Sequence, residues 1–340
     1  MFSAYSRGAD GTLHERFGLP LEALAAGQVF VHRPGITFTQ QENVDEALST
    51  LNSAQVHYDE EHAARTAWRR PLVVSTWTLQ RLLGMTWKTF GVARRRIEGM
   101  HDVRMTRPVF AGDTLSARTE VLNVGARGRV RLRTEADNQR GEVVASADYT
   151  VSMWREHELP QPLRRVGEPA VEPRFASHVG DAGRWLETFG LCFEDLRAGE
   201  TFAHAPRRLL EAHEIAALAR RALDWSPRPL DACEVPQAWL LGLATALTTL
   251  TFGRVSANLG WSDVRFLHDP RAGDLLQARS TIVDTRLSRS RTDEGIAQVH
   301  TTLLDGEGRE VLDFRRALLV YRRGHEPRSL AAGAPAAAHP

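Results

Sequence analysis

The sequence contains few cysteines and no Cys/His cluster with the spacing of zinc ligands. Only Cys192 and Cys233 occur, and neither belongs to a CxxC pair. This composition gives no case for a structural metal, and it suits a reducing, cytoplasmic environment.

Long apolar runs and an excess of one charge are also absent. No stretch approaches the ~20 apolar residues of a membrane span, and residues 1–10 lack an apolar run that could act as a signal peptide. The formal net charge is +1, from 43 basic and 42 acidic residues, which favours neither nucleic acid nor an anionic membrane surface as a partner. We expect a cytosolic protein that acts on a small molecule.

An internal repeat divides the 340 residues into two similar halves. Leu24–Pro34 recurs as Leu196–Pro206, at a numbering offset of 172, and a histidine stands at the same place in both copies, as His32 and His204. Further on, Asp102–Arg104 recurs as Asp263–Arg265 at an offset of 161. Because the offset falls, the second half is shorter than the first between these two matches. Each half is still long enough to bury its own core.

Each half follows the same order of elements. Apolar residues at helical spacing predict a helix over 39–52, and a second, more apolar helix is expected over 71–84, with Ser75 as its N-cap and Gly84 at its end. Period-two alternation over 115–121 and 130–135, and a segment at 142–154, then predict antiparallel strands. In the second half, helices are expected over 211–224 and 239–252.

This order predicts an α+β double hot-dog, in which two curved antiparallel sheets each wrap a central helix and are related by a pseudo-twofold axis. We expect the sheets to lie side by side, with a ligand tunnel between the halves. The composition further predicts a loosely held arm, an N-terminal domain, a proline-rich linker, a C-terminal domain and a disordered tail, over residues 1–16, 17–155, 156–190, 191–323 and 324–340.

Several segments carry a closer resemblance to a known family: Asn52–Asp59, Arg70–Pro71, Phe110–Leu115 and Val255–Phe266. Together they resemble the MaoC-like (R)-specific enoyl-CoA hydratase/dehydratase family in its double hot-dog form, particularly its mesaconyl-CoA hydratase and methylmalyl-CoA dehydratase branch. The resemblance implies a hydro-lyase that needs no separate cofactor and acts on an acyl-CoA or acyl-carrier thioester, with CoA as part of the substrate. It leaves open the acyl group, the direction of reaction and a homo-oligomer.

The family's loop reads Asp, any residue, Asn, Pro, an aliphatic residue, His, any residue, and Asp or Asn. This chain keeps His57 and Asp59 but has Asn52 at the position of the first Asp. The resemblance therefore implies His57 and Asn52 as catalytic residues. An amide can hold water or the thioester carbonyl but cannot accept a proton, so Asn52 either contributes to the chemistry or shapes the loop. We expect Asp59 to hold the loop through backbone N–H groups.

Two further groups of residues are candidates for contacts with the substrate. The backbone N–H groups of Val74 and Ser75, at the start of the apolar helix, can stabilise an oxyanion, which is compatible with an ordinary helix cap. Five arginines either meet CoA phosphates or form solvated faces: Arg69, Arg70, Arg94, Arg95 and Arg96.

The second half lacks the histidine of the loop. Carrying the offset of 172 forward places Asp224, Pro229 and Asp231 on Asn52, His57 and Asp59. Since proline cannot transfer protons, we expect this half to form a wall for the ligand. The substitutions also leave open an acyl-thioester binding or partner protein with reduced catalysis. A hot-dog thioesterase is a further alternative, although no residue is identified for its chemistry.

Overall fold

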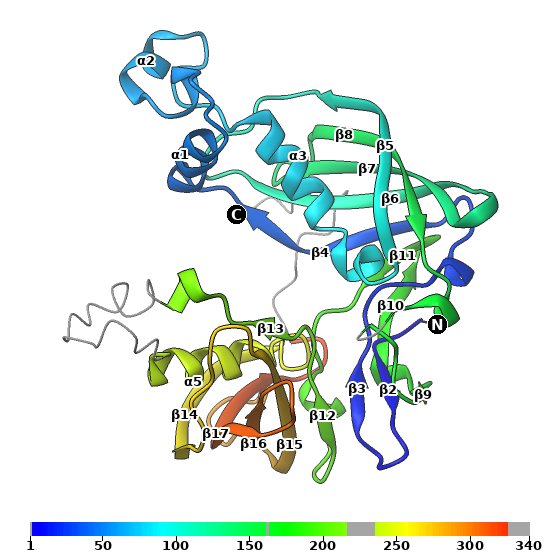
Figure 1. Cartoon of the computed structure of the whole chain (residues 1–340), viewed down its shortest axis with the longest axis vertical. Helices are drawn as coiled ribbons and strands as arrows, with labels where there is room; N and C mark the ends of the chain where they lie inside the picture. The colour runs from blue at the N-terminus through cyan, green and yellow to red at the C-terminus, as the bar shows by residue number, and fades with distance from the viewer. Residues whose placement is uncertain (1, 161–162, 216–234, 326–340) are drawn as a thin grey trace.

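The computed structural model describes residues 2–160, 163–215 and 235–325 (Figure 1). In the N-terminal half, a curved antiparallel sheet packs against one central helix. The sheet follows the order β4 (Val29–Thr37), β6 (Thr114–Val124), β7 (Arg129–Asn138), β8 (Val143–Met153) and β5 (Arg94–Met105). The helix α3 (Ser75–Gly84) packs on β7 and β8.

Helix α3 buries one face because its inward residues are four positions apart. Thr78 and Leu82 are both buried, and Leu82 is fully enclosed in the core between helix and sheet. Burial of a leucine side chain contributes about 1.5–3 kcal/mol. On β6, the expected alternation is observed, because Leu115, Ala117, Thr119 and Val121 are fully buried while Ser116, Arg118 and Glu120 are partly exposed.

The C-terminal half repeats this arrangement. Its sheet follows the order β14 (Val255–Phe266), β17 (Glu310–Tyr321), β16 (Glu294–Leu304), β15 (Leu275–Leu287) and β12 (Thr201–Ala203). Helix α5 (Gln237–Ala246) packs on β15, β16 and β17, so the helix expected over 239–252 begins earlier and ends at Ala246. Most of the helix expected over 211–224 lies outside the described residues. The two halves are therefore two hot-dog units, as the sequence predicted.

The remaining elements lie outside the two main sheets and their central helices. They include the helices α1 (Gln40–Ser49) and α2 (Glu60–Arg65), and the strand β13 (Arg208–Leu209), which pairs with β15. Single helical turns occur at η1 (Leu21–Ala23), η2 (Gln55–His57), η3 (Trp87–Gly91), η4 (Ala126–Gly128), η5 (Glu156–Glu158), η6 (Pro173–Phe175) and η7 (Phe193–Asp195). No helix among the described residues is long and apolar enough to cross a membrane.

The expectation of a loosely held N-terminal arm is wrong. After β1 (Phe2–Ser3), the strands β2 (Tyr5–Arg7) and β3 (Leu13–Glu15) form a hairpin, and β3 pairs in parallel with β12 of the C-terminal sheet. Tyr5 and Leu13 are buried in the core of that half. These apolar residues anchor the arm, although glycine and polar residues surround them in the sequence.

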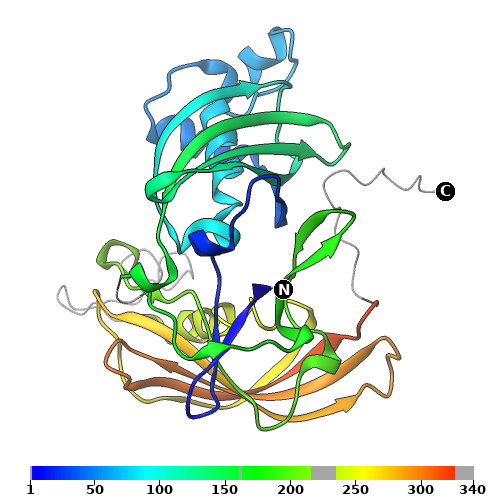
Figure 2. The same ribbon diagram turned by 90° about the vertical axis from the view of Figure 1, so that its right-hand side faces the viewer.

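The segment expected as a linker also forms a hairpin, as the N-terminal arm does. It contains β9 (Glu168–Pro169), β10 (Ala176–Asp181) and β11 (Arg184–Glu187), and β11 pairs in parallel with β4 of the N-terminal sheet. Each half therefore receives a hairpin that precedes the other half in the sequence (Figure 2). We call β2–β3 and β10–β11 the exchanged hairpins.

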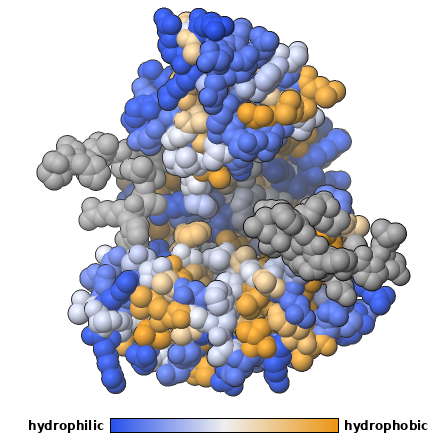
Figure 3. Space-filling model, turned by 90° about the vertical axis from the view of Figure 1, so that its left-hand side faces the viewer, coloured by the Kyte–Doolittle hydropathy of each residue, from blue (hydrophilic) through white to orange (hydrophobic). Residues whose placement is uncertain are grey.

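The two sheets are separate and share no pair of hydrogen-bonded strands among the described residues. β5 and β14 end their sheets, and neither pairs with a further strand among the described residues. Both edges carry partly exposed apolar side chains, such as Met100 on β5 and Trp261 on β14. On the face shown in Figure 3, the surface of the N-terminal half is mainly hydrophilic, whereas apolar side chains gather on the C-terminal half. The exchanged hairpins, rather than a continuous sheet, join the halves.

Candidate active site

The candidate site is built around Asn43, a fully buried residue of α1. The helix begins with a capping box, in which the Thr39 hydroxyl accepts a hydrogen bond from the Glu42 N–H and the Glu42 carboxylate accepts one from the Thr39 N–H. One turn inside, Asn43 Nδ2 donates to the carbonyl oxygens of His57 and Leu72, each at 2.8 Å. Its Oδ1 accepts from the Val74 N–H at 2.8 Å. Asn43 thus joins α1, the His57 loop and the start of α3.

The His57 side chain is held in one orientation. Its Nδ1 lies 2.9 Å from the Leu72 carbonyl oxygen, and because a carbonyl can only accept, Nδ1 carries the proton of the neutral ring. The backbone of His57 is fixed as well, since its carbonyl oxygen also accepts from Gln40 Nε2 at 2.9 Å. In this tautomer Nε2 has a free lone pair, and the half-buried ring can accept a proton there.

Asn52 and Asp59 shape the loop on either side of His57. Asn52 Oδ1 accepts from the Ala54 N–H at 3.0 Å. Asp59 is the N-cap of α2, with its Oδ1 accepting from the His62 N–H at 2.9 Å. No hydrogen bond connects either side chain to the His57 ring in the part of the chain that the structure describes. The amide nitrogen of Asn52 remains available to a ligand.

The start of α3 differs from the expectation at one residue. Val74, not Ser75, is the N-cap, and its N–H is occupied by Asn43, so Val74 cannot donate to a substrate oxygen. Ser75 and Thr76 are exposed, and their N–H groups bond to no other described protein group. These free donors, at the positive end of the helix dipole, can receive an oxyanion.

The half of the chain that contains this site matches a known protein family. Residues 22–142 match the family described as MaoC like domain. The chain is also 33% identical over 146 residues to a mesaconyl-CoA hydratase of Cereibacter sphaeroides, a match that covers 39% of the chain and 42% of that protein. For a mesaconyl-CoA hydratase of Haloarcula hispanica, the identity is 30% over 157 residues, or 43% of each protein. The matches therefore span less than half the length of these curated relatives.

Solved structures resemble the chain over a greater length. A putative MaoC domain protein dehydratase from Chloroflexus aurantiacus is 21% identical, with 90% of this chain and 98% of that chain covered and a TM-score of 0.40. A double hotdog protein of Mycobacterium tuberculosis is 20% identical, with 89% and 99% covered and a TM-score of 0.36.

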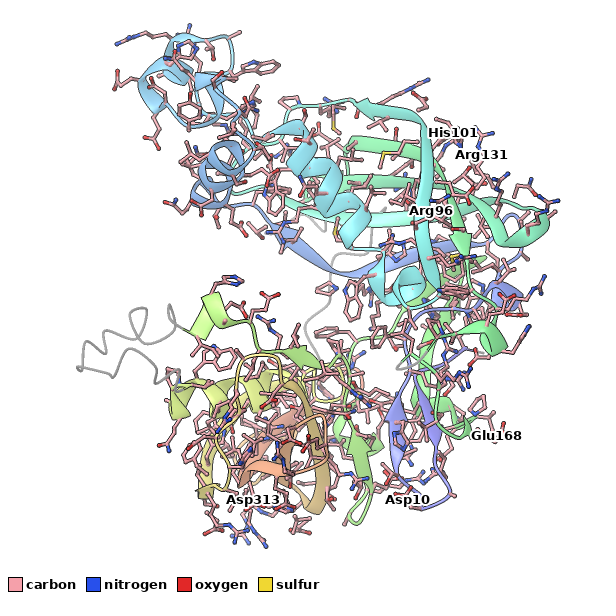
Figure 4. All side chains as sticks on the ribbon, in the orientation of Figure 1. Asp10, Arg96, His101, Arg131, Glu168 and Asp313 are labelled. Atoms are coloured by element: carbon pink, nitrogen blue, oxygen red, sulfur yellow. The ribbon has the colours of Figure 1, made fainter. Side chains whose placement is uncertain are left out.

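The candidate arginines lie at both ends of α3 in the N-terminal half. Arg70 lies near the His57 loop, where its guanidinium stacks over the Phe110 ring at 3.8 Å. At the other end, a cavity of about 530 Å³ is lined by five arginines and a single glutamate: Arg94, Arg95, Arg96, Arg127, Arg129 and Glu98. Arg96 and His101 come from β5, the edge strand of this sheet, and Arg131 comes from the inner strand β7 (Figure 4). The side chain of Arg69 is exposed, and its guanidinium donates a hydrogen bond to the Ala64 carbonyl oxygen at 3.5 Å.

Among the described residues, the second half has no counterpart of Asn43. At the offset of 172, the position of Asn43 is occupied by Ile215, a buried residue that cannot tie three backbone segments together. Asp224, Pro229 and Asp231 lie outside the described residues. No group of His, Cys, Asp and Glu side chains among the described residues is arranged to hold a metal ion.

Two buried polar clusters, which the sequence patterns did not indicate, hold the exchanged hairpins. His32 Nδ1 donates to Glu187 of β11 at 2.9 Å, and Thr89 also donates to this carboxylate. Burial alone would raise the pKa of Glu187, but the hydrogen bond and charge of His32, with the nearby Lys88, lower it to about 2. His178 of β10 lies beside Thr89, and its burial lowers its pKa to about 4.

The second cluster repeats this pattern at the equivalent place in the C-terminal half. His204 Nδ1 lies 3.2 Å from Glu15 of β3, and Thr251 donates to the same carboxylate. The other Glu15 oxygen accepts from the Ala205 N–H at 2.7 Å. The repeated histidine of the sequence motif was the available signal, but its acidic partners lie outside the motif. Both clusters are structural, because each is enclosed where a hairpin meets a sheet.

Proposed function

We propose that this chain is a hydro-lyase that adds water to, or removes it from, the 2,3 double bond of an acyl thioester of CoA. The observation that carries the proposal is the fixed tautomer of His57, with Nδ1 bonded to Leu72 and Nε2 free. The match to the MaoC like domain family supports the same reaction class.

The start of α3 supplies the second requirement of this chemistry. Leu72 contacts the His57 ring and precedes Ser75 by three residues, a distance that extended chain spans in at most about 11 Å. A single thioester can therefore face the imidazole with its double bond and the free N–H groups of Ser75 and Thr76 with its carbonyl oxygen. Those donors stabilise the negative charge that develops on this oxygen.

Hydration then proceeds through two proton transfers, both at His57 Nε2. His57 Nε2 accepts a proton from water as the oxygen bonds to C3, and the electrons of the double bond move towards the thioester carbonyl. The imidazolium returns the proton at C2, which completes the addition of one water. Asn52 orients the water through its amide nitrogen, and dehydration is the same sequence reversed.

A panel of 2-enoyl-CoA thioesters tests this function. The panel includes straight-chain, branched and dicarboxylic acyl groups, followed by loss of enoyl absorbance and by the mass gain of one water. We expect hydration of at least one compound by the wild type and its loss in His57→Ala. Absence of a water adduct with every compound would refute the hydro-lyase.

A second candidate is an acyl-thioester binding protein with reduced catalysis. It is favoured by one observation, the amide of Asn52 where the family motif has a carboxylate. Tight binding of several enoyl-CoA compounds without any water adduct supports this candidate over the first.

A further inference from the structure

A cavity of about 400 Å³ lies where the two halves and both exchanged hairpins meet. Its wall includes Phe2 and Glu15 from the N-terminal arm, His178 from β10, Lys88 from η3 and Leu250 from the C-terminal half. None of His57, Asn52, Asp59 or Ser75 lines it. The cavity is therefore distinct from the candidate active site, and its residues play no part in the proposed hydration.

The only lysine in the sequence faces this cavity. Lys88 stands alone among 43 basic residues, the rest of which are arginines. Its ammonium donates to the Thr188 carbonyl and forms no ion pair with a carboxylate among the described residues. Burial lowers the pKa of this ammonium below its ordinary value. An ammonium has three N–H donors, so Lys88 has capacity for a further acceptor.

Arg33 provides a second cation in the same wall. Its side chain makes no hydrogen bond or ion pair with another described group, and its Nε is enclosed without a partner. Burial also lowers the pKa of this guanidinium. Two cationic groups thus face one cavity with most of their donors unsatisfied, an arrangement that is costly unless an anion completes it.

The acids of the cavity are already engaged elsewhere. One Glu187 oxygen accepts from His32 and Thr89, and the other accepts from the Arg33 N–H at 2.9 Å. Glu15 is likewise committed to His204, Thr251 and the Ala205 N–H. In total the wall contains seven lysine or arginine side chains but only four aspartate or glutamate side chains. The surplus positive charge favours an anionic ligand.

The wall is apolar beside these charges. Leu19, Leu191, Leu250 and Val179 line the cavity together with Phe2. Its volume lies at the lower end of the ~300–1,000 Å³ range of small-molecule sites. A ligand that uses both features has a carboxylate at one end and a short apolar body.

We propose that this cavity binds a short-chain organic carboxylate, held by Lys88 and Arg33. The carboxylate accepts hydrogen bonds from both side chains, and the carbon chain packs against the leucines. Because the wall draws on both halves, the bound anion stabilises their association. Inorganic phosphate shares the charge but lacks the apolar body, so it should bind more weakly.

Calorimetric titration of the full-length protein with butyrate, succinate and inorganic phosphate tests the proposal. We expect wild-type binding of a carboxylate in the micromolar to millimolar range, weakened at least about tenfold in Lys88→Met and in Arg33→Gln, the loss typical of a hydrogen bond to a charged group. Lys88→Arg, which keeps the charge, should retain part of the affinity. Arg131→Gln, on the β5–β8 sheet and outside the cavity lining, is the matched control and should bind like the wild type.

The single lysine allows a second measurement on the unaltered protein. An amine-specific acetylating reagent can modify only Lys88 and the terminal amine, and mass spectrometry separates the two. Succinate or butyrate should slow acetylation of Lys88 without affecting the terminus. The same protection in His57→Ala would show that the site is independent of the active site.

Three results would contradict the proposal or the independence of the two sites. No heat and no protection at millimolar carboxylate would overturn the proposal, as would undiminished binding in both Lys88→Met and Arg33→Gln. Loss of protection in His57→Ala would overturn the separation of the two sites. If Lys88→Met does not fold, Arg33→Gln and the acetylation of wild-type protein still decide the matter.

Discussion

Asn43 connects more of the candidate site than any residue that the sequence patterns selected. Its three hydrogen bonds reach the carbonyls of His57 and Leu72 and the N–H of Val74. The same contacts fix the His57 loop, direct the ring towards Leu72 and remove Val74 as a donor. The geometry of the site therefore depends on a residue that takes no part in the proposed proton transfers.

Replacement of Asn43 with leucine should destabilise the protein strongly. The change leaves the Val74 N–H buried without a partner, at a cost of about 1–3 kcal/mol. It also removes one of the two hydrogen bonds accepted by each of the His57 and Leu72 carbonyl oxygens, at about 0.5–1.5 kcal/mol each. We expect the free energy of unfolding, measured by urea denaturation, to fall by at least about 2 kcal/mol. Gln41→Ala, at an exposed position of the same helix, is the control and should change it by less than about 0.5 kcal/mol. Equal effects in the two variants would contradict the assigned role.

His57→Ala should abolish most of the hydration activity without unfolding the protein. Loss of a general base or acid typically costs ~10²-fold or more in rate. The measurement is kcat/KM for whichever enoyl-CoA proves to be a substrate. His62→Ala provides a matched control, because His62 is an exposed histidine on the adjacent helix α2 and should keep wild-type activity.

Asn52→Asp distinguishes the two roles of this residue by the sign of its effect. An aspartate can accept the Ala54 N–H as Asn52 does, so the loop should keep its shape. We expect kcat/KM to fall, because the amide donor that orients the water is lost and the new half-buried carboxylate is partly desolvated. An increase in kcat/KM with unchanged stability would instead identify Asn52 as a deficient replacement for a carboxylate.

The sequence predicted the candidate residues unevenly, for physical reasons. His57 and Asp59 stand in a recognisable loop motif. Asn43 lies in a helix whose spacing of Val44, Ala47, Leu48 and Leu51 predicts that these four residues form the buried face. In the structure Leu48 is 60% exposed and Leu51 90% exposed, and the buried face carries Asn43 and Ala47. A polar residue whose partners are all backbone groups has no signature in side-chain periodicity.

Among the elements, the long strands and apolar helices were predictable but the exchanged hairpins were not. β6 has 11 residues and displays its period-two alternation fully. β2 and β3 have three residues each, too few for any period to emerge, and β3 pairs with a strand from the opposite half of the sequence. In the sequence, Glu15 and Glu187 resemble surface residues. In the structure both side chains are buried, Glu15 against His204 and Glu187 against His32.

The hairpin β10–β11 should make the protein sensitive to acid. His178 has a folded pKa of about 4, below its ordinary value near 6.5, so the unfolded chain binds more protons between these values. Stability is therefore lost as the pH falls from about 6.5 to 4. Glu187, with a pKa of about 2, continues the loss below pH 4.5, where its carboxylate is protonated more readily in the unfolded chain.

Urea denaturation across this pH range measures the effect. We expect His178→Gln to have a flatter stability profile between pH 6.5 and 4 than the wild type, because the titrating ring is absent. His157→Gln removes an exposed histidine of η5 and should leave the wild-type slope unchanged. An unaltered slope in His178→Gln would contradict the burial of a neutral imidazole at this position.

At the scale of the whole molecule, residues at the N-terminus stabilise the C-terminal half. Leu13 is fully buried beside Phe202, and β3 covers the edge of β12. Leu13→Ala should lower the free energy of unfolding by about 2–5 kcal/mol, the range for truncation of an enclosed leucine. Hydrogen exchange should accelerate in β12 more than in β6. Leu51→Ala, at a 90% exposed leucine, is the control, and equal exchange in the two variants would argue against this coupling.

The exchanged hairpins also bear on the ancestry of the chain. Each unit of one hairpin and one hot-dog sheet pairs its hairpin with the first strand of the other unit, not with its own. Two such units, exchanging hairpins, form a closed pair with twofold symmetry. Joining the end of one unit to the beginning of the next reproduces the present topology without moving a strand. The internal repeat and this pairing are what duplication of a hairpin-exchanging dimer within one polypeptide would produce.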